Sequence, residues 1–267
     1  MMYEYFSAII LGMIEGLTEF LPVSSTGHMI LAGHLLGFEG GAADTFKIVI
    51  QLGAVLALLV LYWTRYIQML KNLLRFDFSA GKLNALHLII AMIPALIVYL
   101  LFKDLIKTVL FGAGPVLIGL VSGGILLIIG VRAKRRVTAE TTDDITYKQA
   151  LGIGLFQCLS LWPGFSRSGS TISGGMLLGT SQKAAADFTF IISVPVMLGA
   201  TVLDLLDNRQ YLNADDLLLF AAGFVTAFLV ALLAVVTFLK LVKTFRLEWF
   251  ALYRFALAAI FYLFLMR

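Results

Sequence analysis

The chain has 267 residues, of which 60% are hydrophobic and only 13% are charged, and its mean hydropathy is +0.96. A soluble domain carries roughly a quarter charged residues, so a water-soluble globular fold is excluded. The net charge of +4 indicates membrane topology rather than nucleic-acid binding, because basic residues gather on the cytoplasmic side of membrane proteins. We therefore expect an all-α, multi-pass membrane protein that contacts lipids and no nucleic acid.

The chain opens with two apolar stretches, 5–22 and 25–37, which are separated by Pro22 and the run S-S-T-G. Each stretch is short of the ~20 residues that a comfortable membrane span needs. Irregular backbone at membrane depth survives only where protein buries it or where it lines a wet cavity. The pattern predicts a re-entrant helical hairpin whose tip lies near the middle of the membrane.

Longer apolar stretches then recur, each close to the ~20 residues of a full span. They cover 45–63, 85–102, 115–131, 187–203, 217–239 and 249–266. The polar linker 132–149 lies between the third and the fourth of them. We expect one membrane domain, residues 1–267, built from a first pseudo-repeat of about 1–131 and a second of about 150–267.

The second half begins with an altered copy of the first, because residues 8–50 align without gaps with 150–192. The aligned pairs include Ser24 with Ser166, Ser25 with Arg167 and Gly27 with Gly169. The copy is interrupted at Pro163-Gly164, which predicts a second re-entrant hairpin. Each half then has three full spans, and an odd number inserts the second half upside down. The expected fold is an inverted-topology repeat.

The distribution of basic residues orients this repeat. Lysine and arginine are concentrated in 64–82, 132–148 and 240–248, which places these loops in the cytoplasm. Both termini are then outside, the first hairpin enters from outside and the second from the cytoplasm. We expect the two polar tips to meet and the site between them to open toward the outer face.

The first tip, E-G-L-T-E-F-L-P-V-S-S-T-G-H (15–28), is rich in polar groups. Glu15 and Glu19 are four residues apart and lie on one helix face, where they invite a metal ion, a shared proton or a cationic partner. Ser24 or Ser25 is a natural N-cap for the helix that follows. His28, beside these groups, is a candidate nucleophile or general base. His34 and His87 lack such neighbours and are expected to be structural.

The second tip, W-P-G-F-S-R-S-G-S-T (162–171), supplies a positive charge. The planar guanidinium of Arg167 matches phosphate oxygens, and glycines let the backbone approach a ligand closely. Both half-helices aim their positive ends at the same point, so the pattern predicts a phosphate site. The candidate substrate-binding residues are Ser24, Thr26, Gly27, Ser166, Ser168, Gly169 and Ser170.

At these motifs, and along essentially its whole length, the chain resembles the bacterial undecaprenyl pyrophosphate phosphatases, the bacitracin-resistance family. The resemblance implies hydrolysis of a polyprenyl pyrophosphate in the bacterial inner membrane, with a divalent cation, Mg²⁺ or Ca²⁺, as cofactor. It makes Glu15 and Glu19 essential acids and metal ligands, and Arg167 the clamp on the pyrophosphate. The attacking group is Ser25 with His28 as its base, or His28 itself. The prenyl tail is expected in a groove lined by 187–203 and 217–239.

Two questions stay open at this point. Inverted repeats with broken helices are also the architecture of secondary transporters, so a transporter or flippase of polyprenyl phosphate is the alternative. A nucleophile beside a base favours the enzyme. The small-residue runs 112–115 and 122–124 pack spans either within one chain or between two copies, which leaves a homodimer open.

Overall fold

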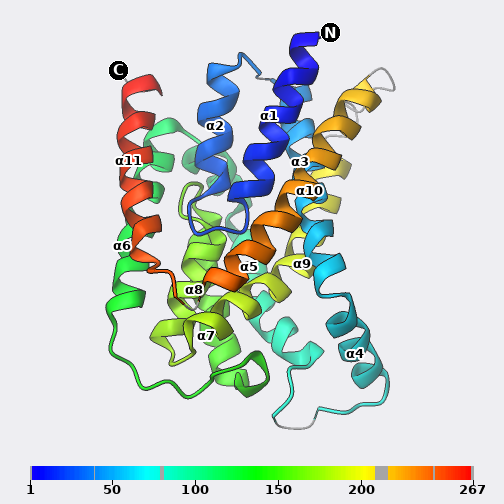
Figure 1. The fold of residues 1–267 in the computed structure, drawn as a ribbon, viewed down its shortest axis with the longest axis vertical. Coiled ribbons are helices and arrows are strands. Elements are labelled where there is room, and N and C mark those ends of the chain that lie inside the picture. Colours follow the sequence, from blue (N-terminus) through cyan, green and yellow to red (C-terminus); the bar gives the residue numbers. More distant parts are fainter. Residues whose placement is uncertain (1, 39, 79–80, 208–215, 243, 266–267) are drawn as a thin grey trace.

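The structure is a computed structural model that describes residues 2–38, 40–78, 81–207, 216–242 and 244–265 (Figure 1). Within these ranges the chain is helical and has no strand, only an isolated bridge between Ala139 and Thr180. Among the described residues, six helices are long and apolar enough to cross a membrane, and they coincide with the six predicted spans. They are α3 (Gly41–Leu61), α5 (Ala85–Leu105, continued by the π-helical turn η1, Ile106–Leu110), α6 (Ala113–Arg132), α9 (Gln182–Asp207), α10 (Leu217–Leu241) and α11 (Glu248–Leu265).

Two pairs of shorter helices occupy the interrupted segments. They are α1 (Met2–Thr18) with α2 (Ser25–Leu35), and α7 (Tyr147–Gln157), followed by the 3-10 turn η3 (Cys158–Leu161), with α8 (Arg167–Leu177). In Figure 1 the α1–α2 pair lies in the half of the molecule that carries both termini, and the α7–α8 pair lies in the opposite half. Non-helical tips, 19–24 and 162–166, join the members of each pair.

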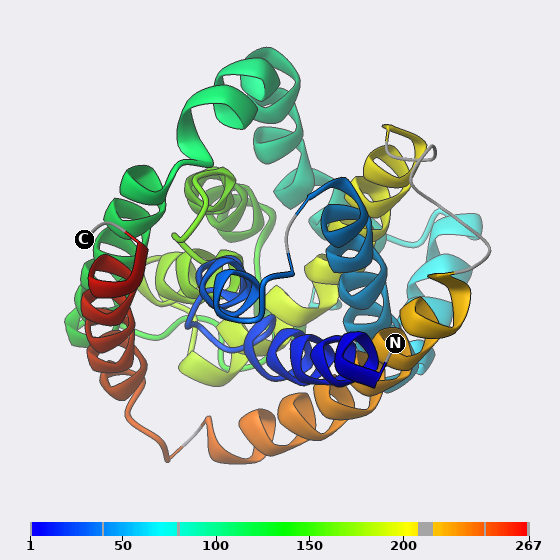
Figure 2. The same cartoon turned by 90° about the horizontal axis from the view of Figure 1, so that it is seen from above.

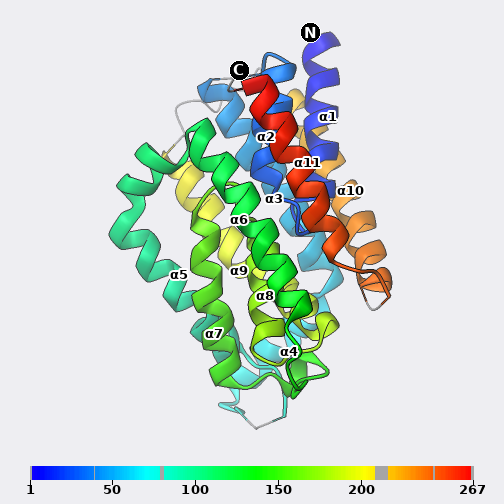
Figure 3. The same ribbon diagram turned by 90° about the vertical axis from the view of Figure 1, so that its left-hand side faces the viewer.

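The longer helices surround these pairs. Seen from above, α2 lies near the centre of the molecule with the longer helices around it (Figure 2), and the side view shows α11 running beside α6 (Figure 3). Phe20 attaches the first tip to α9. Its side chain is fully buried and packs edge to face on Phe190 of α9, with 5.9 Å between the ring centroids. The fold therefore presents both tips to one interior region.

The connection between α6 and α7 is tied to the rest of the molecule at the end opposite the termini. Helix α4 (Trp63–Leu74) follows α3 there, and the short turn η2 (Thr142–Asp144) belongs to the connection. Arg65 of α4 donates two hydrogen bonds to the Asp143 carboxylate, at 3.0 and 3.1 Å, and the backbone N–H of Leu83 donates a third at 3.0 Å. Asp143 thus joins three segments that are far apart in the chain.

Replacing Asp143 with asparagine is expected to destabilise the protein at neutral pH and not in strong acid. Burial raises the pKa of the Asp143 carboxyl, but the Arg65 guanidinium and the Leu83 N–H outweigh it, and the pKa is lowered. The stabilising contribution is therefore complete above the unfolded-state pKa of about 3.9 and is lost as the pH falls through the lower folded-state pKa. In detergent at pH 7 the variant should melt about 2 °C lower than the wild type. Equal melting temperatures of the variant and the wild type at pH 7 would show that the contacts of Asp143 do not stabilise the protein.

Candidate active site

The two half-helices begin in the same way. Ser24 (φ 71°) and Ser166 (φ 72°) are their N-caps, and each serine hydroxyl accepts a hydrogen bond from a glycine N–H, Gly27 at 3.4 Å and Gly169 at 3.1 Å. Of the two N-caps open from the sequence, the structure selects Ser24. The helices α2 and α8 then start at Ser25 and Arg167, which the internal alignment pairs. Both helix N-termini, with their free N–H groups, thereby point into the region between the tips.

Glu19 links the two tips. Its Oε1 accepts a hydrogen bond from Nη2 of Arg167 at 2.6 Å, and its Oε2 accepts one from the hydroxyl of Ser25. A second contact between the tips is the hydrogen bond that Ser168 donates to the carbonyl of Leu21, at 2.8 Å. The tips meet, as the sequence predicts, and one carboxylate holds a hydroxyl from one half and a guanidinium from the other.

Glu15 lies behind Glu19. Helix α1 ends at Thr18, earlier than the apolar stretch predicts. The N–H of Glu19 still donates a hydrogen bond to the carbonyl of Glu15 at 3.0 Å, as in a helix. The two carboxyl groups therefore stay on one side and contact each other. Buried carboxyl groups in contact share a proton or a cation. Their oxygen donors suit a hard divalent cation. No group of three His, Cys, Asp or Glu forms among the described residues, so a cation here would need further ligands besides these two carboxylates.

A polar cavity of about 200 Å³ lies against this centre. Of the predicted site residues, it is lined by Glu19, Ser24, Ser25, Thr26, Ser166 and Arg167. Sequence reasoning did not single out the other polar residues of its wall, Gln51, Ser160 and Trp162. Gln51 could have been predicted from the sequence, because a polar residue inside an apolar span indicates a functional site. The cavity is large enough for a small anion and is bordered by a cation, hydroxyls and two helix N-termini.

The remaining predicted substrate-binding residues support the tips instead. Ser168 and Ser170 are buried, and Ser170 donates to the carbonyl of Arg167 at 3.0 Å within the first turn of α8. The N–H groups of Gly27 and Gly169 are taken by the serine caps. These side chains and backbone groups hold the ends of the half-helices in place.

The structure directs His28 away from Ser25. Its Nδ1 is 2.7 Å from the carbonyl of Ser24, its Nε2 is 2.7 Å from the hydroxyl of Tyr253 in α11, and the two rings stack with centroids 5.5 Å apart. The hydroxyl of Ser25 is bonded to Glu19 instead. The predicted pairing of Ser25 with His28 as its base is therefore absent from the described structure, and Glu19 has that position. His87 has the structural role expected of it, since its Nδ1 accepts from the backbone N–H of Asn84.

Arg254 of α11 is fully buried and holds the second tip from behind. Its Nη2 donates to the carbonyls of Gly119, Gly164 and Phe165 at 2.9–3.1 Å, and its Nε donates to the carbonyl of Leu120 at 3.1 Å. Gly123 faces the guanidinium, so the run 122–124 packs within the chain, against α11. No carboxylate pairs with Arg254 in the described part of the chain. The sequence analysis did not single out Arg254, although an ionisable residue inside a membrane span indicates a functional role.

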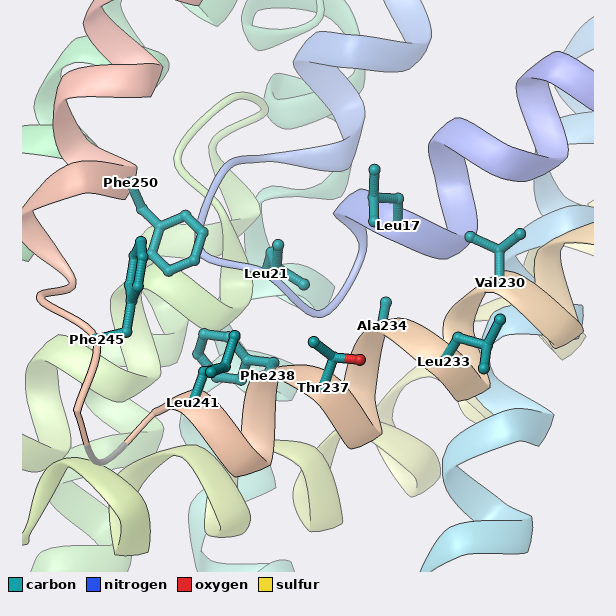
Figure 4. Close-up of a pocket in the computed structure, with 10 residues that line it drawn as sticks. All are labelled: Leu17, Leu21, Val230, Leu233, Ala234, Thr237, Phe238, Leu241, Phe245 and Phe250. Carbon is teal, nitrogen blue, oxygen red and sulfur yellow. The ribbon is translucent and has the colours of Figure 1, made fainter.

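An apolar groove of about 410 Å³ lies on the other side of the first tip (Figure 4). Leu17 and Leu21, which flank Glu19 in sequence, form one wall. The rest is formed by α10, with Leu233 and Phe238 among its lining residues, by Phe245 between α10 and α11, and by Phe250 of α11. Of the two segments expected to line such a groove, 217–239 does so. The other, 187–203, instead places Val196, Met197 and Ala200 at the polar cavity.

Comparison with known proteins places this geometry in context. A family model described as bacitracin resistance protein BacA matches residues 8–260. Proteins named undecaprenyl-diphosphatase 1 from Bacillus cereus, Bacillus anthracis and Bacillus thuringiensis subsp. konkukian are each 54% identical to the chain over 267 residues. Each alignment covers 99% of this chain and 100% of the relative.

Proposed function

The chain belongs to the family of the bacitracin resistance protein BacA and is a membrane undecaprenyl-diphosphatase, and we propose that Ser25, Glu19 and Arg167 perform its reaction. The reaction cleaves undecaprenyl diphosphate to undecaprenyl phosphate and inorganic phosphate, which recycles the lipid carrier of cell-wall synthesis and underlies bacitracin resistance. One observation carries the assignment: the Glu19 carboxylate contacts both the Ser25 hydroxyl and the Arg167 guanidinium beside a polar cavity.

In the proposed mechanism the Ser25 hydroxyl oxygen attacks the terminal phosphorus, and its proton passes to Glu19. The bond from that phosphorus to the bridging oxygen breaks, and its electron pair leaves with undecaprenyl phosphate. Glu19 then releases this proton to solvent and is a base again. Water attacks the phosphoserine and gives a proton to Glu19, which passes it to the Ser25 oxygen as the bond between that oxygen and phosphorus breaks and phosphate is released. Attack by His28 remains the alternative, but its ring is turned toward Tyr253.

The same residues bind the diphosphate. Arg167 and the free N–H groups at the starts of α2 and α8 face the negative charge that must be neutralised in phosphoryl transfer. Glu15 and Glu19 are the proposed ligands of a divalent cation, Mg²⁺ or Ca²⁺, which when bound supplies further charge neutralisation. The ring of His28 and the hydroxyl of Tyr253 hold the first turn of α2 in register.

The test is phosphate release from undecaprenyl diphosphate by the purified protein in detergent. We expect turnover that EDTA abolishes and that added Mg²⁺ or Ca²⁺ restores. Turnover that is insensitive to EDTA would contradict the role of Glu15 and Glu19 as metal ligands, but not the phosphatase activity. Tight binding of the diphosphate without any phosphate release would contradict the enzyme and favour the transport alternative.

We propose further that the fold is an inverted repeat in the bacterial inner membrane, with α1–α2 and α7–α8 as re-entrant hairpins from opposite sides. The opposed positions of the two pairs in Figure 1 support this arrangement. The end that carries α4 and the basic connection 132–136 is assigned to the cytoplasm. The α1–α2 pair then enters from outside, and the active site opens to the periplasmic or outer face.

The groove of Figure 4 is the proposed site of the prenyl tail. Leu17 and Leu21 form one of its walls while Glu19 between them lines the polar cavity, so the first tip borders both spaces. A tail of many isoprene units gains binding free energy in proportion to the apolar surface that it covers. Chain length is then recognised at α10 and diphosphate at the tips.

Replacing Leu233 with tryptophan tests this groove. The larger ring should obstruct it and raise KM for undecaprenyl diphosphate roughly tenfold, while KM for a short-chain prenyl diphosphate stays unchanged. Leu229→Trp is the matched control, because Leu229 is an exposed leucine on the same helix outside the groove. A rise in KM that is equal for both variants, or equal for both chain lengths, would refute the assignment.

A further inference from the structure

Helix α4 carries a line of apolar side chains that no other segment in the described part of the chain covers completely. They recur every three or four residues, so they follow one side of the helix. We call them the outer row: Trp63, Ile67, Leu70 and Leu74. Three of them are 51–72% exposed, and Ile67 is half-buried.

A different flank of α4 attaches the helix to the protein. Met69 is only 4% exposed, and the hydroxyl of Tyr66 donates to the carbonyl of Ile191 in α9 at 2.6 Å. Arg65 adds the ion pair with Asp143. The helix is therefore held with a fixed face outward, and the exposure of the outer row is a property of the fold rather than of a loose segment.

The position of α4 along the chain locates the outer row relative to the membrane. Helix α3 has 21 residues, which at 1.5 Å per residue is about 31 Å, enough to cross the ~30 Å of hydrocarbon. Only Tyr62 separates α3 from α4. Helix α4 thus begins where the hydrocarbon ends, which is the place of amphipathic helices that lie in the headgroup region.

Exposed basic residues accompany the outer row. Lys71 lies within α4, and Arg75 follows its end. At the same end of the molecule (Figure 1), α6 ends at the exposed Arg132, and the exposed residues Lys134, Arg135 and Arg136 follow it. Basic clusters directly beside a membrane span attract anionic headgroups. Apolar and positive groups together match a surface of acidic phospholipid.

We propose that α4 is an interfacial binding surface for anionic phospholipids, with the outer row inserted among the acyl chains and Lys71 and Arg75 on the headgroups. This surface is independent of the reaction at the tips. The apolar side chains provide insertion into any bilayer, and the two cations provide the selection for negative charge.

A fluorescent bimane at position 70 tests the proposal in nanodiscs. Leu70→Cys is made in a Cys158→Ala background, because Cys158 is the chain's one cysteine. Quenching is measured with phosphatidylglycerol and phosphatidylcholine that carry the same acyl-chain nitroxide, at equal mole fraction. Gln68→Cys is the matched control, because Gln68 is exposed and two residues of helix turn it about 200° away from Leu70. Phosphate release by each labelled protein checks that it is folded.

We expect strong quenching at position 70, little at position 68, and about fivefold stronger association of phosphatidylglycerol per basic residue involved. The pair of substitutions Lys71→Gln and Arg75→Gln should lower the ratio between the two lipids by about that factor for each residue replaced. Equal quenching at positions 70 and 68 would overturn the interfacial placement. An unchanged ratio after the two substitutions would overturn the headgroup contacts. Self-quenching between probes of two copies, without lipid quenching, would identify the surface as a dimer interface instead.

Discussion

Replacing Glu19 with glutamine is expected to lower kcat for phosphate release roughly 10²–10⁴-fold, the usual contribution of a general base. Glutamine has nearly the same shape but cannot accept the proton of Ser25, and it loses the charge that pairs with Arg167 at 2.6 Å. Removal of one partner leaves the Arg167 guanidinium, which is largely buried, without its counterion. The effect should therefore appear in kcat and in the melting temperature.

Ser25→Ala and Ser24→Ala form the matched pair for this experiment. Both are serines at the start of α2, but only Ser25 is bonded to Glu19, whereas Ser24 caps the helix. Ser25→Ala should abolish turnover without a large change in stability. Ser24→Ala should cost about 1 kcal/mol of stability and retain measurable turnover. Wild-type turnover in Ser25→Ala would exclude Ser25 as the nucleophile.

The role of His28 separates the two mechanisms that the sequence leaves open. If Glu19 is the base, His28→Gln should retain more activity than Glu19→Gln, because the histidine contacts Ser24 and Tyr253 rather than Ser25. A phosphohistidine mechanism requires the opposite order. Isolation of the phosphorylated enzyme, followed by the acid stability of the bond, distinguishes phosphoserine from phosphohistidine directly.

Hydropathy and charge predict the membrane-spanning helices because the membrane constrains both the length of a span and the placement of charged residues. Apolar stretches near 20 residues have one stable use in hydrocarbon, so all six spans appear where expected. A pairing of Arg167 with Glu15 or Glu19 also follows from such reasoning, since charges of opposite sign at two buried tips neutralise each other, and the structure shows it for Glu19. The N-cap serines follow from the chemistry of helix starts, which repeats at Ser24 and Ser166.

Side-chain directions are harder to predict, because distant residues decide them. Ser25 and His28 are close on the first turn of α2, and proximity in sequence predicts their contact. Tyr253 is 225 residues away from His28 and turns the imidazole toward α11. Helix α10 borders the apolar groove and α9 the polar cavity for a similar reason. Helix α10 packs against α1 and α3, and α9 packs against α3 and α8, which sets the faces that they present.

Arg254→Met is expected to destabilise the protein by several kcal/mol, because each buried carbonyl that loses its donor costs about 1–3 kcal/mol. The fully buried guanidinium binds four backbone carbonyls, and methionine leaves these oxygens without that donor. Two of the carbonyls, those of Gly164 and Phe165, directly precede Ser166 and Arg167. A displacement of about 1 Å at a catalytic group can cost about 10²-fold in rate, so kcat/KM should fall with stability.

Arg254→Lys separates the loss of charge from the loss of the planar fork of donors. Lysine keeps the positive charge but cannot reproduce the fork, so we expect a partial recovery of the melting temperature while kcat/KM stays below the wild-type value. Arg246→Met is the control for loss of an arginine near α11, because Arg246 is largely exposed and pairs only with Glu248 at 3.4 Å among the described contacts. Thermal unfolding in detergent and phosphate-release kinetics measure both effects. Wild-type kinetics in Arg254→Met would show that the second tip keeps its position without this anchor.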